Sequence, residues 1–570
     1  MSRRRRPTFL RRLPGPMSVL LPALWLAGCG SSPMPKGPVL PPAGALRPAA
    51  SASASTVSAA PSPASPVAPP AVTSPLEPGA IAARFPEPPV TYALASLEPG
   101  RQEFTTPAEL QERLQALVVP RASTPTGNPT SITLVPLGNS QDGAPLQALV
   151  FTKHPSPTPA VIVRGGRPTV MIVAQQHGDE PAGTEALLLI AEELAGGSLQ
   201  DLLERINVVI LPRANPDGAA RAKAALSDGT DLDTDHLLLT SPEARAMARL
   251  ASDYRPLLVI DAHEYPVDTA YAERVGGAQR ADLQLQYAGT AGVPDFISKA
   301  SEEWFRQPLL GALKQEGLSI EWAHRVAADG QRVTMGNARP DTARNVNGLR
   351  NAVSVVLESR GGNLGRAHLG RRVFSHVAAI GALLKSSAQR ADDLVKLRKY
   401  VDASVRADVC SGTALIDARL TPAEHTLVLL DPSTGADKSV ALSNWDSSLA
   451  LRDAKRRSRP CGYWLGADQS NAVGRLRGLG LRVEQLSEAF DGMQADANSG
   501  APVAGERETL EFKAPAGSYY VPLSQPWGNL VVAALEPDSA QGFLANKVVS
   551  SPARLRKVTA VPKVRRTLVP

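Results

Sequence analysis

With 570 residues, of which 43% are hydrophobic, the chain is long enough for two or three domains and apolar enough to build their cores. Its formal net charge of +7 does not predict a nucleic-acid-binding surface, because the charge is unevenly placed. Six of the positive charges are arginines within residues 1–28, a segment without acidic residues, and the rest of the chain carries only +1. We therefore expect no nucleic-acid partner.

Residues 1–28 have the pattern of a targeting segment. A basic stretch precedes an apolar run over residues 17–28, which is too short to span a bilayer as a stable helix. The run ends in Leu26-Ala27-Gly28-Cys29, which resembles a bacterial lipobox, with Cys29 as the lipidated residue. An ordinary signal peptide and an uncleaved anchor are the alternatives. The prediction is a lipoprotein signal peptide and a protein held at the bacterial cell envelope, on the outer membrane or facing the periplasm.

Residues 29–90 are rich in Pro, Ala and Ser and contain few large apolar side chains. Such a segment buries too little surface to offset the entropy of ordering, so we expect a disordered tether. A folded domain is predicted over residues 91–400, beginning with a helix over residues 107–118, where Leu110, Leu114 and Leu117 have helical spacing.

Strands and helices alternate through this domain. A buried helix is expected over residues 184–195, and short β-branched runs predict strands at 169–174, 206–211, 256–260 and 353–357. Alternation of this kind predicts an α/β fold with a largely parallel or mixed central sheet and helices on both faces.

A smaller accessory α+β domain is predicted over residues 401–550, with strands at 508–512 and 530–535, followed by a solvated basic tail at 551–570. After Cys29 is assigned to lipid, Cys410 and Cys461 remain. In an oxidising compartment this pair predicts a disulfide, and two buried free thiols are the alternative.

Polar residues follow each predicted strand, where α/β sheets bind their ligands. His177 and Glu180 follow the first strand, and His263 follows a later one. Two imidazoles and one carboxylate form a common catalytic zinc set, with one coordination position left for water. Asp231 is the candidate acceptor that would orient the imidazole of His177.

The ordered set of motifs resembles the zinc carboxypeptidase family (peptidase family M14) over residues 100–385. The motifs are His177-x-x-Glu180, Asn215-Pro-Asp-Gly218, Asp231-Leu-Asp-Thr-Asp-His236, Asp261-Ala-His-Glu-Tyr265 and Leu357-Glu-Ser-Arg-Gly361. The resemblance implies one Zn²⁺ per chain, held by His177, Glu180 and His263, and a zinc-activated water with Glu358 as general base. Arg221 is the candidate oxyanion stabiliser, with Lys223 as a rival.

Two departures from the family pattern concern substrate binding. Family members carry Asn-Arg where this chain has Asp233-Thr234, and that pair normally grips the C-terminal carboxylate of the substrate. The tyrosine expected near the reacting centre is also missing, since no Tyr lies between Tyr287 and Glu358. Arg344 and Arg350 are the candidate replacements for the carboxylate anchor.

The sequence thus predicts a zinc metallocarboxypeptidase that hydrolyses peptides outside the cytoplasm, with cell-wall peptides as one hypothetical substrate. One alternative is a zinc-dependent amidohydrolase or deacylase that acts on a small N-acyl substrate, or a peptidase that tolerates blocked C-termini. A non-catalytic binding protein is the third. No Gly-x-Ser-x-Gly motif occurs, which disfavours a serine hydrolase.

Overall fold

A computed structural model describes residues 77–119, 130–495 and 509–570. The predicted signal peptide, Cys29 and most of the predicted tether lie outside the described residues. Within the described part, no helix is both long enough and apolar enough to cross a membrane.

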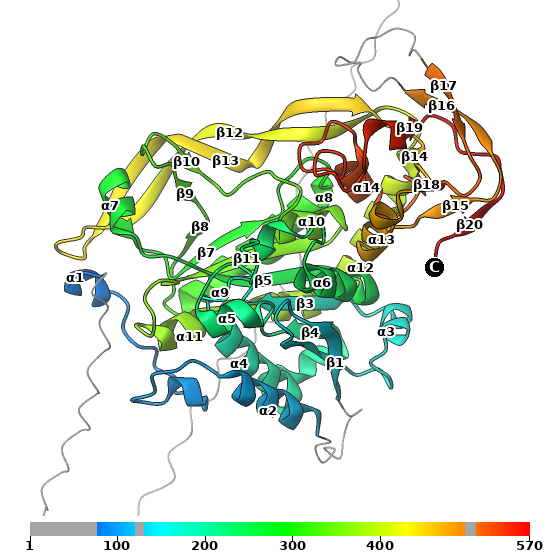
Figure 1. Ribbon diagram of the computed structural model, residues 1–570. Coiled ribbons are helices and arrows are strands. Elements are labelled where there is room, and N and C mark those ends of the chain that lie inside the picture. Colours follow the sequence, from blue (N-terminus) through cyan, green and yellow to red (C-terminus); the bar gives the residue numbers. More distant parts are fainter. Residues whose placement is uncertain (1–76, 120–129, 496–508) are drawn as a thin grey trace, which may run out of the picture. The chain divides into compact units, whose positions relative to one another are not determined.

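An eight-stranded mixed sheet forms the centre of the fold, in the order β1-β2-β4-β3-β5-β11-β7-β8 (Figure 1). The strands are β1 (Ser131–Asn139), β2 (Pro145–Thr152), β3 (Thr169–Ala174), β4 (Asn207–Leu211), β5 (Leu258–Tyr265), β7 (Leu283–Tyr287), β8 (Ile320–Trp322) and β11 (Val353–Arg360). The four central strands β4, β3, β5 and β11 are mutually parallel, whereas β2 and β7 pair with them in the antiparallel sense. The predicted mixed α/β sheet is confirmed.

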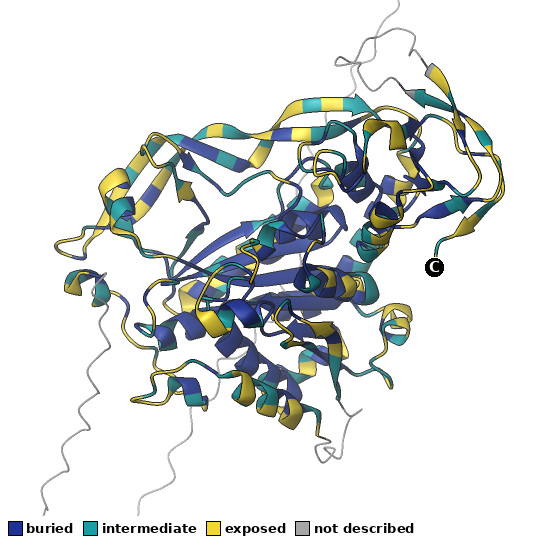
Figure 2. Cartoon of the chain, in the orientation of Figure 1, coloured by how far each residue is buried: buried dark blue, intermediate teal, exposed yellow. Residues whose placement is uncertain are grey.

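The central strands are buried on both faces, which explains their nearly continuous apolar sequence (Figure 2). Along β3, Val170 and Ile172 belong to one hydrophobic cluster, and Met171 and Val173 belong to a second cluster on the other side. Helices α4 (Ala182–Gly196), α9 (Gln307–Gln315) and α11 (Leu369–Gln389) contribute to the first cluster. Helices α6 (Pro242–Tyr254) and α10 (Ala343–Leu349) contribute to the second, so helices cover both faces as predicted.

The remaining helices connect or flank these layers. They are α1 (Gly79–Ala82), α2 (Pro107–Val118), α3 (Pro159–Gly165), α5 (Pro216–Arg221), α7 (Thr269–Val275), α8 (Asp295–Ala300), α12 (Ala391–Ala407), α13 (Ser470–Gly478) and α14 (Gly528–Leu535). Helix α2 matches its prediction in both bounds. It begins with a capping box, in which Thr106 accepts from the backbone of Glu109 and the Glu109 side chain accepts from the backbone of Thr106.

Two strands extend further than predicted. The sequence predicts strand ends at residues 260 and 357, because polar residues follow, but β5 runs to Tyr265 and β11 to Arg360. The two strands pair in parallel register through their last residues, including Glu358 with His263. His263 and Glu358 therefore project from the sheet rather than from loops.

A long two-stranded ribbon is the main departure from the predicted organisation. Strands β12 (Thr413–Leu430) and β13 (Asp437–Ser458) form it, and it joins the short strands β6 (Ala278–Gln279), β9 (Arg325–Val326) and β10 (Val333–Thr334) in one sheet (Figure 1). The predicted domain boundary at residue 400 falls inside α12, and the ribbon that follows pairs directly with β6 and β10, which precede that boundary. The segment that follows the predicted boundary therefore shares a sheet with strands that precede it.

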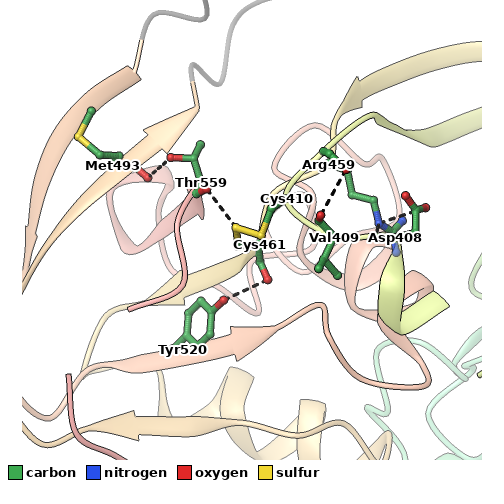
Figure 3. Close-up of a disulfide and its surroundings, with 9 residues drawn as sticks. Asp408, Val409, Cys410, Arg459, Cys461, Met493, Tyr520 and Thr559 are labelled. Atoms are coloured by element: carbon green, nitrogen blue, oxygen red, sulfur yellow. Dashed lines mark hydrogen bonds and ion pairs between the residues drawn. A yellow bond between two sulfur atoms is a disulfide. The ribbon is translucent and has the colours of Figure 1, made fainter. Parts of the chain in front are cut away.

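The C-terminal part forms a seven-stranded sheet, in the order β17-β16-β19-β14-β18-β15-β20. Its strands are β14 (Gly462–Leu465), β15 (Glu484–Leu486), β16 (Phe490–Ala495), β17 (Thr509–Ala514), β18 (Tyr519–Pro522), β19 (Leu555–Val558) and β20 (Arg566–Leu568). The predicted disulfide between Cys410 and Cys461 is present beside this sheet, where the carbonyl oxygen of Thr559 contacts Cys461 (Figure 3).

Three expectations for the ends of the folded part are corrected. Residues 551–570 are not a solvated tail, because they supply β19 and β20, and Lys557 is buried against Glu536. Residues 530–535 lie in α14 instead of a strand. At the other end, the predicted tether is ordered from Glu77 onward.

Glu77 fixes this N-terminal segment with a buried ion cluster. Its carboxylate pairs with Arg360 at 2.6 Å and with His368 at 2.9 Å. Burial would raise the pKa of Glu77, but these two partners lower it. Phe85 adds a ring that packs 4.0 Å from the Arg360 guanidinium carbon. The composition of residues 77–90 did not predict this structure, because a few specific contacts of Glu77 and Phe85 hold the segment in place.

Candidate metal centre and substrate pocket

Three donor side chains meet at the end of β3 and beside it on β5. Nδ1 of His177 lies 2.9 Å from Oε1 of Glu180, and Nδ1 of His263 lies 2.9 Å from Oε2 of the same carboxylate. All three groups offer a ligand atom within 4.8 Å of one another. Two imidazole nitrogens and a carboxylate oxygen are a donor set that suits a catalytic zinc ion. The three residues therefore fit the zinc ion that the family resemblance implies.

The loop that carries His177 and Glu180 rests on the Asn-Pro-Asp-Gly turn. Gly178 lies so close to this turn that a Cβ atom on it would approach the carbonyl carbon of Gly218 to 2.0 Å. Asn215 caps α5 by accepting from the backbone N–H of Gly218, and its amide donates to the carbonyl oxygen of Gln176 at 3.1 Å. The turn motif therefore has a positioning role, since it supports the loop that bears two of the metal donors.

Each histidine also contacts a carboxylate through its outer nitrogen. Nε2 of His177 lies 3.2 Å from Asp231, as the sequence predicts, and Nε2 of His263 lies 3.2 Å from Asp261. Proton donation to these carboxylates would leave both Nδ1 lone pairs free for a metal. Behind Asp261, the amide of Gln176 donates to its second oxygen, and His236 contacts the other end of Gln176 at 2.8 Å. His236 thus belongs to the support of the site and not to its lining.

The charges within the cluster shift its pKa values strongly. Burial alone would lower the pKa of His177, but Glu180 and Asp231 raise it to about 10. The pKa of His263 is likewise raised well above its usual value by Asp261 and Glu180, against the effect of burial. Burial would raise the pKa of Glu180, yet the two histidines hold it far below its usual value. The carboxylates thus create a strongly cation-attracting site at the end of the sheet.

Glu358 lies beside the donors because of strand register. It pairs with His263 across β11 and β5, and partners in a parallel pair point to the same face of the sheet. Its carboxylate lies 4.0 Å from the guanidinium of Arg325. Glu358 and the three donors line one pocket of about 280 Å³. The complete lining is His177, Glu180, Asp233, His263, Glu264, Gln286, Ala323, His324, Arg325, Gly336, Asn337, Arg344, Val356 and Glu358.

Arg344, one of the two arginines predicted to bind the substrate's carboxylate, lies in the pocket. It lines the pocket although only 8% of it is exposed, and Nη2 donates to the carbonyl oxygen of Asn337 at 3.1 Å. Its buried Nε has no hydrogen-bond partner among the described residues. Burial lowers its pKa, whereas Asp233 and Glu358 oppose that shift. A buried guanidinium with unused donors, in a pocket beside a metal site, is suited to bind an anionic group.

Three other predicted binding residues lie elsewhere. Arg221 pairs with Asp142 at 2.6 Å on the surface, so the structure does not place it where an oxyanion stabiliser must be. Arg350 is buried under the ring of Trp527, 5.9 Å from the ring centre, and does not line the pocket. Thr234 donates to the carbonyl oxygen of Asp231 and only stabilises its own turn. Asp233 does line the pocket, in the position where the family carries Asn.

Sequence reasoning missed the opposite wall of the pocket. His324, Arg325 and Asn337 come from the segment between β8 and α10, and Gln286 comes from β7, between β11 and β8. Their segment has neither a recognisable motif nor a strong periodicity, so no sequence signal assigned them to the site. Glu264 also lines the pocket, but its carboxylate pairs with the buried Arg372 at 2.5 Å.

Comparisons with known proteins agree with this chemistry. The sequence model described as zinc carboxypeptidase (Peptidase_M14) matches residues 123–236, which include His177, Glu180 and Asp231. Carboxypeptidase 2 of Trichophyton tonsurans is 23% identical over 405 residues, which cover 65% of this chain and 72% of the relative. Carboxypeptidase 2 of Trichophyton rubrum is 24% identical over 407 residues, with the same coverage. Carboxypeptidase D of Rattus norvegicus is 38% identical over 117 residues, which cover 18% of this chain and 8% of the relative.

Among solved structures, the metallo-carboxypeptidase from Burkholderia cenocepacia aligns with 18% identity and a TM-score of 0.35, covering 50% of this chain and 70% of that one. Carboxypeptidase A from Helicoverpa armigera aligns with 16% identity and a TM-score of 0.37, covering 53% and 78%.

Proposed function

We propose that the chain is a zinc metallocarboxypeptidase of the zinc carboxypeptidase family, in which His177, Glu180 and His263 hold the zinc and Glu358 moves the protons of hydrolysis. The observation that carries this assignment is the convergence of the three donors within 4.8 Å, in one pocket with Glu358. The donors and the carboxylate come from three strand ends that are far apart in the sequence, and the sheet brings them together.

The mechanism follows from the placement of Glu358. Zinc, when bound, acts as a Lewis acid that lowers the pKa of a coordinated water towards neutrality. Glu358 takes a proton from the attacking water as its oxygen bonds to the scissile carbonyl carbon. Glu358 then delivers that proton to the leaving amine nitrogen as the C–N bond breaks. Arg325 lies 4.0 Å from Glu358 and is the cation that would stabilise the negative oxygen formed from the scissile carbonyl. It takes the oxyanion-stabilising role for which Arg221 was the sequence candidate.

Arg344 takes the place of the missing carboxylate-binding arginine in this proposal. Replacing Arg344 by Met should lower kcat/KM for a peptide with a free C-terminal carboxylate by about 30-fold or more, because loss of one partner of a buried charge pair costs about 2–5 kcal/mol. The matched peptide with an amidated C-terminus should change far less. Both rates can be measured by mass spectrometry of the released products. Equal losses on the two peptides would show that Arg344 does not recognise the carboxylate.

A second candidate function is supported by Asp233. This carboxylate lines the pocket where the family holds the substrate's C-terminus, and it would repel a carboxylate that came close. An amidohydrolase that removes an acyl group from a small N-acyl substrate, or a peptidase for blocked C-termini, would avoid that repulsion. Equal wild-type rates on free and amidated peptides would favour this candidate. A non-catalytic binding role is disfavoured, since the three donors and Glu358 are all present in one pocket.

The cellular setting is also part of the proposal. The lipobox-like Leu26-Ala27-Gly28-Cys29 supports attachment to a bacterial envelope membrane through a lipid on Cys29, and the Cys410–Cys461 disulfide suits an oxidising compartment. Peptides of the cell wall would then be within reach of the enzyme. Expression with a labelled fatty acid should label the wild-type protein and not Cys29→Ser. Equal labelling of the two proteins, or none in either, would exclude lipidation at Cys29.

A further inference from the structure

The wall of the pocket opposite the metal donors is a short hairpin, residues 323–337. Its two ends contribute the pocket-lining residues, which include Arg325 at the start and Asn337 at the end. Between them, β9 and β10 pair in the antiparallel sense, Val333 with Val326. The position of this wall hairpin therefore decides where one side of the substrate pocket lies.

The ribbon strand β13 holds the wall hairpin from outside. β10 pairs with it in parallel, Val333 with Trp445 and Thr334 with Asp446 (Figure 1). The backbone N–H of Met335 donates to the carbonyl oxygen of Asp446 at 2.9 Å, and the Asp446 carboxylate, which is buried, pairs with Arg332. These contacts fix both the strand and the turn of the hairpin to the ribbon.

The ribbon is itself anchored at its far end. Leu429 and Leu430 of β12 pair with β6, and Lys438 of β13 donates to the carbonyl oxygen of Gly276 at 2.7 Å. Arg84, from the ordered N-terminal segment, donates to the carbonyl oxygen of Gly435 at the ribbon's turn. These contacts hold the end of the ribbon that lies beyond its pairing with the wall hairpin.

A chain of hydrogen bonds leads from the ribbon to the carboxylate anchor. Gln286 donates from Nε2 to the Ser448 hydroxyl oxygen and to the carbonyl oxygen of Met335, both at 2.9 Å. Gln286 packs so tightly on Gly336 that a Cβ atom there would lie 2.0 Å from its amide oxygen. The next residue, Asn337, offers the carbonyl oxygen that accepts from Nη2 of Arg344.

We propose that the ribbon is a positioning element for substrate recognition, in which Ser448 and Asp446 hold the wall hairpin so that Asn337 aims Arg344 at the substrate's carboxylate. This inference rests on the proposed role of Arg344. Ser448 and Asp446 touch no substrate themselves, and they act through Gln286 and the wall hairpin. The accessory segment thereby becomes part of the specificity machinery of the enzyme.

The test compares ribbon variants on matched free and amidated peptides. Ser448→Ala removes the acceptor of a buried amide, and Asp446→Asn weakens the tie to Arg332. Each should lower kcat/KM for the free peptide by about tenfold, the equivalent of one buried hydrogen bond, through a rise in KM. The amidated peptide should lose clearly less than the free peptide, since it does not use the anchor, although Arg325 on the same hairpin serves both peptides. Asp453→Asn is the matched control, because Asp453 is on the same strand and makes a surface pair with Arg456.

A double-mutant cycle separates positioning from general damage. In an Arg344→Met background, Ser448→Ala should have no further effect on the free peptide, because the anchor through which it acts is gone. Additive losses would overturn the proposal, and so would an unchanged preference for the free peptide in both ribbon variants. If the wild-type protein shows no such preference, the role of Arg344 fails and this inference fails with it. If the wild type shows the preference and both variants keep it, only the role of the ribbon fails.

Discussion

Glu358→Gln is expected to lower kcat by about 10²–10⁴-fold, the usual contribution of a general acid–base group, while stoichiometric zinc stays bound. The amide has the shape of the carboxylate but cannot accept the proton of the attacking water. Glu358 is also not one of the three donors that converge within 4.8 Å. In this variant, therefore, kcat should fall while the zinc content stays at one per chain.

The control for this variant is an exposed glutamate outside the pocket. Glu112→Gln on α2 should leave both kcat and zinc content unchanged. Initial rates and metal analysis on the same samples give both quantities. Full activity in Glu358→Gln would remove the carboxylate from the mechanism, and loss of zinc in that variant would make Glu358 a metal ligand.

His263→Ala is expected to lose both stoichiometric zinc and hydrolysis. Nδ1 of His263 is one of two imidazole donors at the site, and the remaining His177 and Glu180 cannot complete a catalytic zinc set. The variant also leaves Asp261 and Glu180 without the ring that each contacts. Metal content after dialysis against a weak chelator should therefore fall towards zero.

His154→Ala is the matched control, because His154 lies outside the pocket. It should keep the zinc and the activity of the wild type. A folded His263→Ala protein, checked by circular dichroism, that keeps one zinc per chain would contradict the assignment of His263 as a ligand.

The sequence was most informative where regular strands carry function. β3 matches its prediction in both bounds, and the donors follow or end the strands that their apolar runs predicted. Periodicity works here because central strands are buried on both faces and read as continuous apolar segments. It failed at the ends of β5 and β11, because the residues there are polar although most of them are buried.

Long-range contacts account for most of what the sequence could not predict. The ribbon β12–β13 is held in place by its pairing with β6 and β10, which lie far away in the sequence. Arg350 was predicted at the pocket because it shortly precedes the last predicted strand, but six residues, about 1.7 helical turns, separate it from Arg344. Its side chain lies under Trp527 instead. Arg325 was not singled out, because only the tertiary fold brings it to Glu358.

The central claim is that hydrolysis from the C-terminus depends on a metal held by His177, Glu180 and His263. The most direct measurement is a time course of one unblocked peptide, followed by mass spectrometry, with zinc-loaded protein, chelator-treated protein and chelator-treated protein after zinc is restored. The account predicts that single residues leave from the C-terminus, that chelation stops their release and that zinc restores it. Internal cleavage, or release that continues at the same rate without metal, would contradict it.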